Sequence, residues 1–279
     1  MPTSDAQAAT TNRDYAVALS RAFAGAVLFS LPLLMTMEMW WLGHDMSPWM
    51  LIQFSFANLV MLFGLSKVAG FEASHSSHDD MLDSLAAYGV GALTAAVALS
   101  LMGVVGPEQP LGEIAGKIAV QTIPASFGAM IGAKLLGEGK EIEAGECWRD
   151  TYSGQLFLMV AGALFLSFTM APTEEIMLVA NQIDPAQALL IIAVSMILLH
   201  AILYFVEFHG QEKRRGGRGH GVGLFRTTLP GYAIAFAVSF YMLWTFGRIE
   251  GLALLPAVTA AVVLALPASI GAGIARIVV

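Results

Sequence analysis

Three glutamates stand in apolar stretches of this sequence, where an acidic side chain is costly. Glu38 lies two residues after Thr36 in the segment Thr-Met-Glu-Met-Trp, and Glu174 and Glu175 end the segment Met-Ala-Pro-Thr-Glu-Glu. An ionised carboxylate at the centre of a membrane costs roughly 2.5–3.5 kcal/mol on insertion scales. Burial also raises the pKa of a carboxyl group, which can then exchange protons near neutral pH. Glutamates in this setting are typical of sites that bind or pass cations or protons.

A proline beside two of these acids is expected to add backbone oxygens at the same place. Pro172 has no N–H to donate to the carbonyl of Phe168, so we expect a kinked helix and a free oxygen there. Free carbonyls and carboxylates form a hard-oxygen environment that suits Na⁺, Ca²⁺, Mg²⁺ or H⁺. Pro32 is placed to do the same near the first glutamate, and Thr36 and Thr173 stand beside the acids as further candidate ligands.

A second interpretation places the same acids at the membrane surface. If the first helix starts near Ser20, Glu38 lies about 27 Å along it, close to the outer interface. Glu175 lies about one and a half turns from the polar Asn181. Headgroup water could solvate both carboxylates at these depths.

Matching positions in an internal repeat favour a functional role for the acids over simple solvation. Glu175 follows Glu38 by 137 positions, within a longer match at the same offset. Near the end of each half, at an offset of 143, the segment 124–129 (Pro-Ala-Ser-Phe-Gly-Ala) matches 267–272 (Pro-Ala-Ser-Ile-Gly-Ala). A duplicated acid in a duplicated bundle indicates a site on an axis of pseudo-symmetry.

Composition and hydropathy predict an all-α polytopic membrane protein. The 279 residues are 57% hydrophobic and 13% charged, with a mean hydropathy of +0.69, whereas soluble chains carry about 25% charged residues. Eight apolar runs are long enough to cross about 30 Å of hydrocarbon. We place them at 18–42, 49–70, 85–105, 113–136, 153–180, 186–208, 227–247 and 252–277.

The eight spans divide into two copies of four. A tail at 1–17 precedes repeat 1 at 18–136, and a linker at 137–152 leads to repeat 2 at 153–279. Because each copy holds an even number of spans, both enter the membrane in the same direction, and a pseudo-two-fold axis along the membrane normal relates them. We expect the two matching glutamates to face each other across that axis.

The basic residues predict the orientation of the chain. With the N-terminus in the cytoplasm, twelve Lys and Arg residues lie inside and only Lys117 and Arg248 outside, a strong positive-inside bias. Both termini are therefore expected in the cytoplasm. The outer loops carry more acid than base, which would concentrate cations at an entrance on that side.

Small residues predict close helix packing near the end of each copy. Gly128 and Gly132 are four residues apart, as are Ser269 and Gly273, and such pairs let helices approach closely. These faces suit packing inside the chain or a homo-oligomer equally well. Gln121 is expected to form a hydrogen bond between helices.

The loop before the third span holds a ligand-like cluster. His75 and His78 are three residues apart and can share a helical face, with Asp79 beside them, and His209 and His220 lie in the matching loop of the second copy. A solvated loop is the favoured interpretation, because short polar loops acquire such residues freely. Regulatory metal binding is the alternative.

Two segments, Thr169–Ile176 (Thr-Met-Ala-Pro-Thr-Glu-Glu-Ile) and Ile123–Ala129 (Ile-Pro-Ala-Ser-Phe-Gly-Ala), resemble a bacterial family of integral membrane proteins of unknown function. The likeness extends over the whole chain. It implies eight spans and a bacterial inner-membrane setting, and it implies no activity.

These observations favour a protein that moves cations across the bilayer, as a channel or as a cation/proton exchanger, with Ca²⁺, Na⁺ or H⁺ as candidate ions. The candidate ion-binding residues are Thr36, Glu38, Asn58, Thr173, Glu174, Glu175 and Ser195. Two alternatives stay open: a non-transporting scaffold or sensor, and a membrane-embedded metal-dependent hydrolase. The hydrolase would use His75, His78, Asp79, His200 and His209. The nucleotide-binding and hydrolase signatures Gly-x-x-x-x-Gly-Lys-[Ser/Thr], His-Glu-x-x-His and Gly-x-Ser-x-Gly are absent from the sequence, which favours a non-enzymatic protein.

Overall fold

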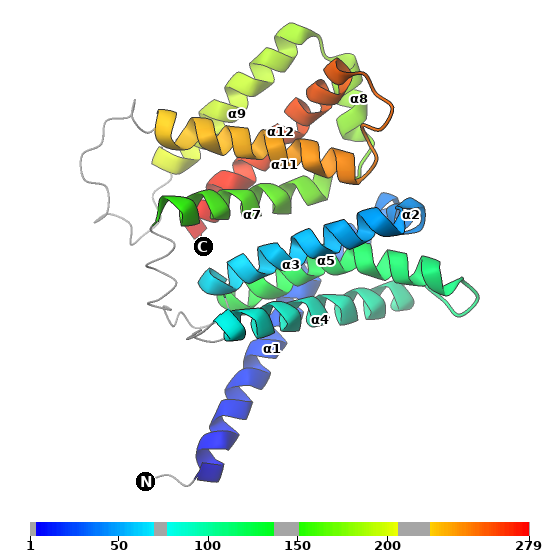
Figure 1. Cartoon of the computed structure of the whole chain (residues 1–279), viewed down its shortest axis with the longest axis vertical. Helices are drawn as coiled ribbons and strands as arrows, with labels where there is room; N and C mark the ends of the chain where they lie inside the picture. The colour runs from blue at the N-terminus through cyan, green and yellow to red at the C-terminus, as the bar shows by residue number, and fades with distance from the viewer. Residues whose placement is uncertain (1–3, 70–76, 137–150, 206–223, 279) are drawn as a thin grey trace. The chain divides into compact units, whose positions relative to one another are not determined.

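The chain folds as helices, as the sequence predicted. The computed structural model describes residues 4–69, 77–136, 151–205 and 224–278, and these contain ten α-helices, one π-helix and no strand (Figure 1). Seven helices in this part of the chain are long and apolar enough to cross a membrane, one fewer than expected. The remaining expected span corresponds to α11 (Leu229–Thr245), whose 17 residues measure about 26 Å against about 30 Å of hydrocarbon.

The chain divides into two compact units, Met1–Asp150 and Thr151–Val279. The helices of the first unit are α1 (Ser4–Leu34), α2 (Met37–Asp45), α3 (Pro48–Ala69), α4 (Ser77–Leu101) and α5 (Leu111–Leu135). All of the others pack against α5, and residues 120–130 of α5 are buried without a gap. The core of this unit therefore surrounds its last helix.

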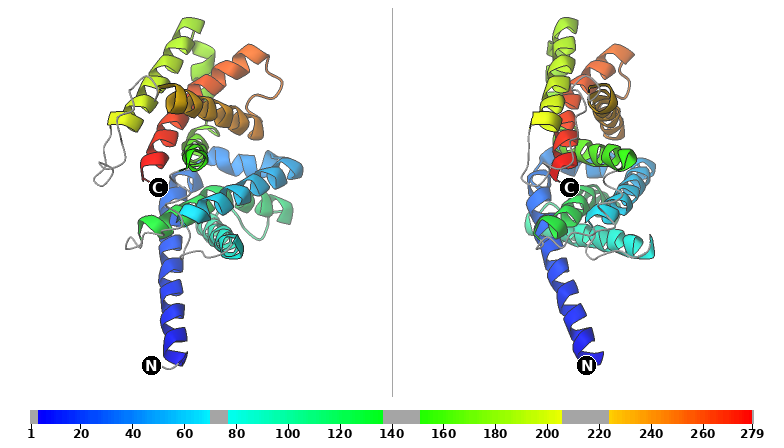
Figure 2. Two further views of the ribbon diagram at one scale, coloured as in Figure 1. Left: turned by 60° about the vertical axis from the view of Figure 1, so that its left-hand side comes forward. Right: turned by 90° about the vertical axis from the view of Figure 1, so that its left-hand side faces the viewer.

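The second unit has the same plan. Its helices are α7 (Tyr152–Met170), α8 (Glu175–Gln182), α9 (Pro185–Phe205), the π-helix η1 (Leu224–Thr228), α11, and α12 (Leu254–Val278). Here α12 is central, because α7, α8, α9 and α11 all pack against it; Figure 2 shows the helices from two further sides.

The two units correspond helix by helix. In chain order α1, α2, α3, α4 and α5 correspond to α7, α8, α9, α11 and α12. The contacts among these α-helices also correspond. Besides the contacts of the central helix, α1 packs on α4 as α7 packs on α11, and α3 packs on α4 as α9 packs on α11. Only the contacts of η1 with α9 and α11 have no counterpart among the described residues of the first unit. The offset that relates the two halves of the sequence thus also relates their contacts.

In each unit the first apolar segment is broken into a long and a short helix. The sequence predicted single spans at 18–42 and 153–180 with a kink near Pro32 and Pro172, and at both places the structure has a full break between two helices. The breaks fall at residues 35–36 and 171–174, which occupy matching positions in the two units.

Proline accounts for the position of both breaks. Pro32 lies in the last turn of α1, and Pro172 lies in the break between α7 and α8. A proline cannot donate to the preceding turn, and its ring crowds the carbonyl there, so the helix ends or bends close to it. At the first break Thr36 takes an extended backbone (φ −89°, ψ 117°), which redirects the chain into α2.

A glycine turn closes α4 and α11 in the same way. Gly103 and Gly247 have φ values of 70° and 68°, a conformation that only glycine adopts at little cost. The next residue then donates to a carbonyl five positions back, from Val104 to Leu99 and from Arg248 to Leu243, at 2.9 Å in both cases. This pattern is a Schellman cap, and it matches at an offset of 144.

The small residues serve contacts within each unit. A Cβ atom built on Gly25 of α1 would lie 2.4 Å from the carbonyl oxygen of Gly128 on α5. A Cβ atom on Gly162 of α7 would lie 2.1 Å from the carbonyl oxygen of Gly271 on α12. Since the neighbours are backbone atoms, they cannot turn aside, and only glycine fits.

We predict that Gly162→Ala destabilises the protein by about 1–3 kcal/mol, because the added methyl group forces α7 and α12 apart. Gly89 of α4 is the matched control, since a Cβ there meets nothing within 4 Å. Gly89→Ala should raise stability by about 0.5–1 kcal/mol through helix propensity. Thermal unfolding of both variants in detergent tests this, and an unchanged melting temperature for Gly162→Ala would contradict it.

Candidate functional site

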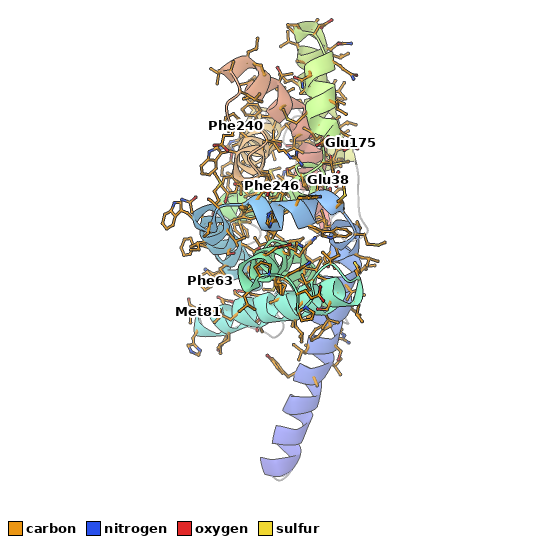
Figure 3. The ribbon with its side chains drawn as sticks, turned by 90° about the vertical axis from the view of Figure 1, so that its right-hand side faces the viewer. Glu38, Phe63, Met81, Glu175, Phe240 and Phe246 are labelled. Atoms are coloured by element: carbon orange, nitrogen blue, oxygen red, sulfur yellow. The ribbon has the colours of Figure 1, made fainter. Side chains whose placement is uncertain are left out.

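Both matching glutamates lie in the first turn of the short helix that follows a break. Glu38 is in the first turn of α2 and Glu175 in the first turn of α8; Figure 3 labels both side chains. The first N–H groups of a helix lack partners within it, and its dipole gives this end partial positive charge, so a carboxylate is stabilised there. The duplicated acids are therefore placed by the same local structure.

Neither glutamate belongs to the buried face of its helix. The short helix α2 buries Met39 and Gly43, and α8 buries Ile176 at the position that matches Met39. By contrast Glu38 is half-buried within its unit and Glu175 is exposed. The contacts of each short helix with the central helix thus leave its carboxylate outside the core.

Glu175 lies beyond the crossing segment Tyr152–Met170, and the pKa of its carboxyl group is lowered from 4.5. The larger cause is the backbone N–H of Glu175 itself, which donates to the carboxylate, and the smaller is the nearby Thr173 hydroxyl. We expected burial to raise this pKa, and that was wrong for Glu175. Its carboxylate stays ionised at neutral pH.

The remaining acid and the two threonines lie at the breaks. Glu174 is exposed and directly precedes α8. Thr36 donates its hydroxyl hydrogen to the carbonyl of Pro32 at 2.7 Å, and Thr173 donates to the carbonyl of Met170 at 2.9 Å. Each threonine hydroxyl therefore reaches back to the last turn of the preceding long helix, and that of Thr173 is also close enough to the Glu175 carboxylate to help lower its pKa.

Side chains from other helices cap the break in the first unit. The amide nitrogen of Gln121 on α5 donates to the Leu33 carbonyl at 2.9 Å, and the indole nitrogen of Trp40 donates to the Leu34 carbonyl at 2.7 Å. Gln121 thus forms the hydrogen bond between helices that the sequence predicted. The Leu33 carbonyl also accepts from the backbone N–H of Thr36 at 3.1 Å, so Gln121 is its second donor. Trp40 supplies the donor that the Leu34 carbonyl needs in an apolar setting.

An arginine caps the break in the second unit. Arg248, in the turn between α11 and α12, donates from its guanidinium to the carbonyl of Pro172. The Pro172 carbonyl therefore lies against a permanent positive charge, whereas the free carbonyl that the sequence predicts is that of Phe168 and stays a prediction. A cation bound at the Pro172 carbonyl would be repelled.

A charged cluster that the sequence analysis did not single out lies at the start of α5. Lys117, 8% exposed, pairs with Glu113 at 2.6 Å, and His44 of α2 lies 3.8 Å from the other oxygen of Glu113. The available signal was the spacing of Glu113 and Lys117, four residues apart at the start of an apolar run. The contact with His44 depends on the packing of Gly43 against Lys117, which the sequence does not reveal.

Asn58 and Ser195 lie deep in their units, on different helices from the glutamates. Asn58 on α3 is 3% exposed and donates its amide hydrogen to the hydroxyl oxygen of Ser126 on α5 at 2.9 Å. Ser195 on α9 is fully buried and donates to the carbonyl of Ile191 in its own helix at 2.7 Å. The matching offset therefore pairs positions that differ in their hydrogen bonds.

The histidine cluster is only partly described. His75 and His209 lie outside the described residues, while His78 is exposed in the first turn of α4, next to Asp79. Within the described ranges, no three His, Cys, Asp or Glu side chains are grouped to hold a metal ion. His200, a residue of the alternative hydrolase, has its Nδ1 2.8 Å from the Thr228 hydroxyl.

Residues 18–279 match the family described as "Putative integral membrane protein (DUF2391)". The chain belongs to this family. The resemblance inferred from the sequence is thereby confirmed, and with it the membrane setting. No curated protein and no solved structure matches the chain.

Family membership gives the exposed apolar side chains a place. Leu189, Leu190 and Ile197 on α9 are each more than 60% exposed within the unit, as are Trp49 and Phe56 on α3. In an integral membrane protein such side chains contact lipid, where they carry no penalty. The family description carries no activity, so the chemistry of the site must be argued from the residues.

We predict that Glu113→Gln lowers the melting temperature by a few degrees, because it leaves the ammonium group of Lys117 without its carboxylate partner. The double variant Glu113→Gln/Lys117→Met should recover most of the loss, since it removes both charges together. Glu108→Gln, in an exposed position of the neighbouring loop, should leave the melting temperature unchanged. Equal losses in the single and double variants would show that the pair does not act as a unit.

Proposed function

We propose that the protein moves inorganic cations across the membrane, with Glu38 and Glu175 as the acids that attract them. The observation that supports this most is the repeated placement of the two glutamates. Each follows a helix break, occupies the first turn of a short helix and lies off the buried face of that helix. A structural acid would need no such repetition, and its carboxylate would pair with a base in its own unit.

The ionised state of the Glu175 carboxylate supports a role in attracting cations rather than in exchanging protons. Its lowered pKa keeps the carboxylate ionised at neutral pH, whereas a group that exchanges protons works best with a pKa near the ambient pH. Glu174 is exposed beside it and would add to the negative potential. We therefore favour a channel or uniporter over an exchanger.

The orientation predicted from the basic residues also supports the proposal that the acids attract cations. With twelve basic residues on one side, we propose that the protein lies in a bacterial inner membrane with both termini in the cytoplasm. Both copies would then enter the membrane in the same direction. In this orientation the short helices α2 and α8 lie toward the outer surface. The acids would meet cations as they arrive from outside, and Thr36 and Thr173 would each stand beside the acid of their own unit.

We predict that Glu38→Gln and Glu175→Gln each reduce cation flux in proteoliposomes at least tenfold, because each removes the charge that concentrates the ion. Na⁺, K⁺, Ca²⁺ and Mg²⁺ are to be screened with the wild type first. Glu250→Gln is the matched control, since Glu250 is an exposed acid in the loop before α12. Wild-type flux in both glutamate variants would contradict the proposal, as would the absence of flux for every ion.

The lowered pKa of Glu175 predicts the pH dependence of this flux. A carboxyl group with a lowered pKa keeps its charge from neutral pH down through the ordinary value of 4.5 and loses it only below. The part of the flux lost in Glu175→Gln should therefore be constant between about pH 5.5 and 8, and should fall only in more acidic buffer. A midpoint near pH 6–7 that disappears in Glu175→Gln would instead indicate proton exchange at this residue.

A further inference from the structure

The last turn of α2 is held against the start of α5 by contacts between backbone atoms. Gly43 is buried there, and a Cβ atom built on it would clash with the Cα of Lys117. A Cβ atom built on Gly116 would clash with the carbonyl oxygen of Gly43. These contacts fix the backbone of the next residue, His44, beside the first turns of α5.

The imidazole of His44 lies between two carboxylates. Its Nδ1 is 3.8 Å from Oε2 of Glu113 on α5, and its Nε2 is 3.9 Å from Oδ1 of Asp45 on α2 itself. A neutral imidazole carries one N–H donor and can direct it at only one of these oxygens, whereas an imidazolium carries a donor on each nitrogen. Only protonated His44 can therefore donate to both carboxylates at the same time.

Glu113 offers a separate oxygen to each of two bases. Its Oε1 pairs with Lys117 at 2.6 Å, while Oε2 is the oxygen that faces His44. With a neutral imidazole, the four ionisable side chains of His44, Asp45, Glu113 and Lys117 sum to a charge of −1, and with an imidazolium they sum to zero. The ammonium group of Lys117 repels an imidazolium, but the two carboxylates balance both positive charges.

Water can deliver a proton to this place. The side chain of His44 is 53% exposed, and the residue lies between the crossing segments Tyr15–Leu34 and Pro48–Lys67. Histidine is the side-chain type that changes charge between about pH 5 and 8. The contact between α2 and α5 can therefore respond to pH in the physiological range.

The second unit has no titratable side chain at the matching positions. Asn181 of α8 matches His44 at the offset of 137. Pro256 and Ala260 of α12 match Glu113 and Lys117 at the offset of 143. The short helix α8 thus provides a comparison within the same chain.

We propose that His44 is a proton-binding site that links the end of α2 to Glu113 of α5, and that α8 of the second unit has no equivalent. The charged groups that bear on His44 are Asp45 and Glu38 from α2, and Glu113 and Lys117 from α5, the helix on which α2 packs. The added link is present in acid, and it is lost as the pH rises through the range in which histidine releases its proton.

This link bears on more than the last turn of α2. The helix has nine residues and carries Glu38 in its first turn, so a stronger hold on its end also holds that acid in place. The inference goes beyond the proposed cation transport and does not rest on it, because proton binding at His44 can be measured without any flux.

The test is hydrogen exchange of the purified full chain in detergent at pH 5.5 and 7.5, with each rate divided by that of an unstructured chain at the same pH. The amides of α2 should exchange about two- to fivefold more slowly at pH 5.5, which is the effect of one partly exposed ion pair. The amides of α8 are the internal control and should show no such change.

Four variants assign the effect to the proposed pair of side chains. His44→Gln should exchange equally at both pH values, and His44→Lys, which stays charged, should be protected at both. Glu113→Gln should lose the pH effect, because the link to α5 ends at this carboxylate. Asp45→Asn is the matched control and should keep most of the effect, since Asp45 belongs to α2 itself.

Several outcomes would overturn the proposal. These are a wild-type α2 with no pH effect, an equal effect in His44→Gln, and an effect of the same size in α8, which would show a general response of the fold. Loss of the effect in Asp45→Asn but not in Glu113→Gln would place the contact within α2 and refute the link to α5. None of these results depends on whether the protein conducts cations.

Discussion

Every backbone oxygen at membrane depth needs a donor, and this requirement governs the two helix breaks on which the candidate site depends. A break is tolerated in the first unit because Trp40 donates to the Leu34 carbonyl, and because Gln121 and the backbone N–H of Thr36 both donate to that of Leu33. It is tolerated in the second because Arg248 donates to Pro172. Without such caps the chain would gain by continuing the long helix, and the glutamates would enter the bilayer within it. With them, each carboxylate stands at the N-terminal end of a short helix, where the helix dipole stabilises it.

The two copies share their close helix contacts but use different side chains to cap the carbonyls at the helix breaks, and there is a physical reason for this difference. Gly25 against Gly128, and Gly162 against Gly271, bring backbone atoms together, so no residue with a Cβ fits there. A carbonyl cap is less demanding, because any donor of suitable reach can supply the hydrogen. Gln121 on α5 therefore donates to a carbonyl at the break in the first unit, and Arg248, in the turn before α12, does so in the second. A tight contact restricts residue type far more than a hydrogen bond does.

Sequence patterns were sufficient for the features that depend on composition and local spacing. Apolar length predicted the helices, and matching offsets predicted that Glu38 and Glu175 occupy equivalent places, as the first turns of α2 and α8 bear out. Pro32 and Pro172 predicted kinks, but hydropathy did not show that each kink is a complete break, because a few non-helical residues leave an apolar run almost unchanged. The role of Arg248 could not be foreseen, since it is 76 residues from Pro172 and only the fold brings them together.

The buried side chains of the two units differ more than the arrangement of their helices. This difference bears on which unit could discriminate between ions. At the offset of 143, Lys117 and Gln121 of α5 correspond to Ala260 and Leu264 of α12 in the sequence. At the offset of 137, Asn58 corresponds to Ser195. Burying these polar groups in a membrane bundle costs free energy, whereas burying the apolar residues at the matching positions of the second unit does not. The acids of the short helices are common to both copies, whereas buried amide and charged side chains occur, among the described residues, in the first copy alone; the buried polar side chains of the second are hydroxyls. Attraction of an ion by the acids can therefore be shared between the units, but contacts with buried amides are available only in the first.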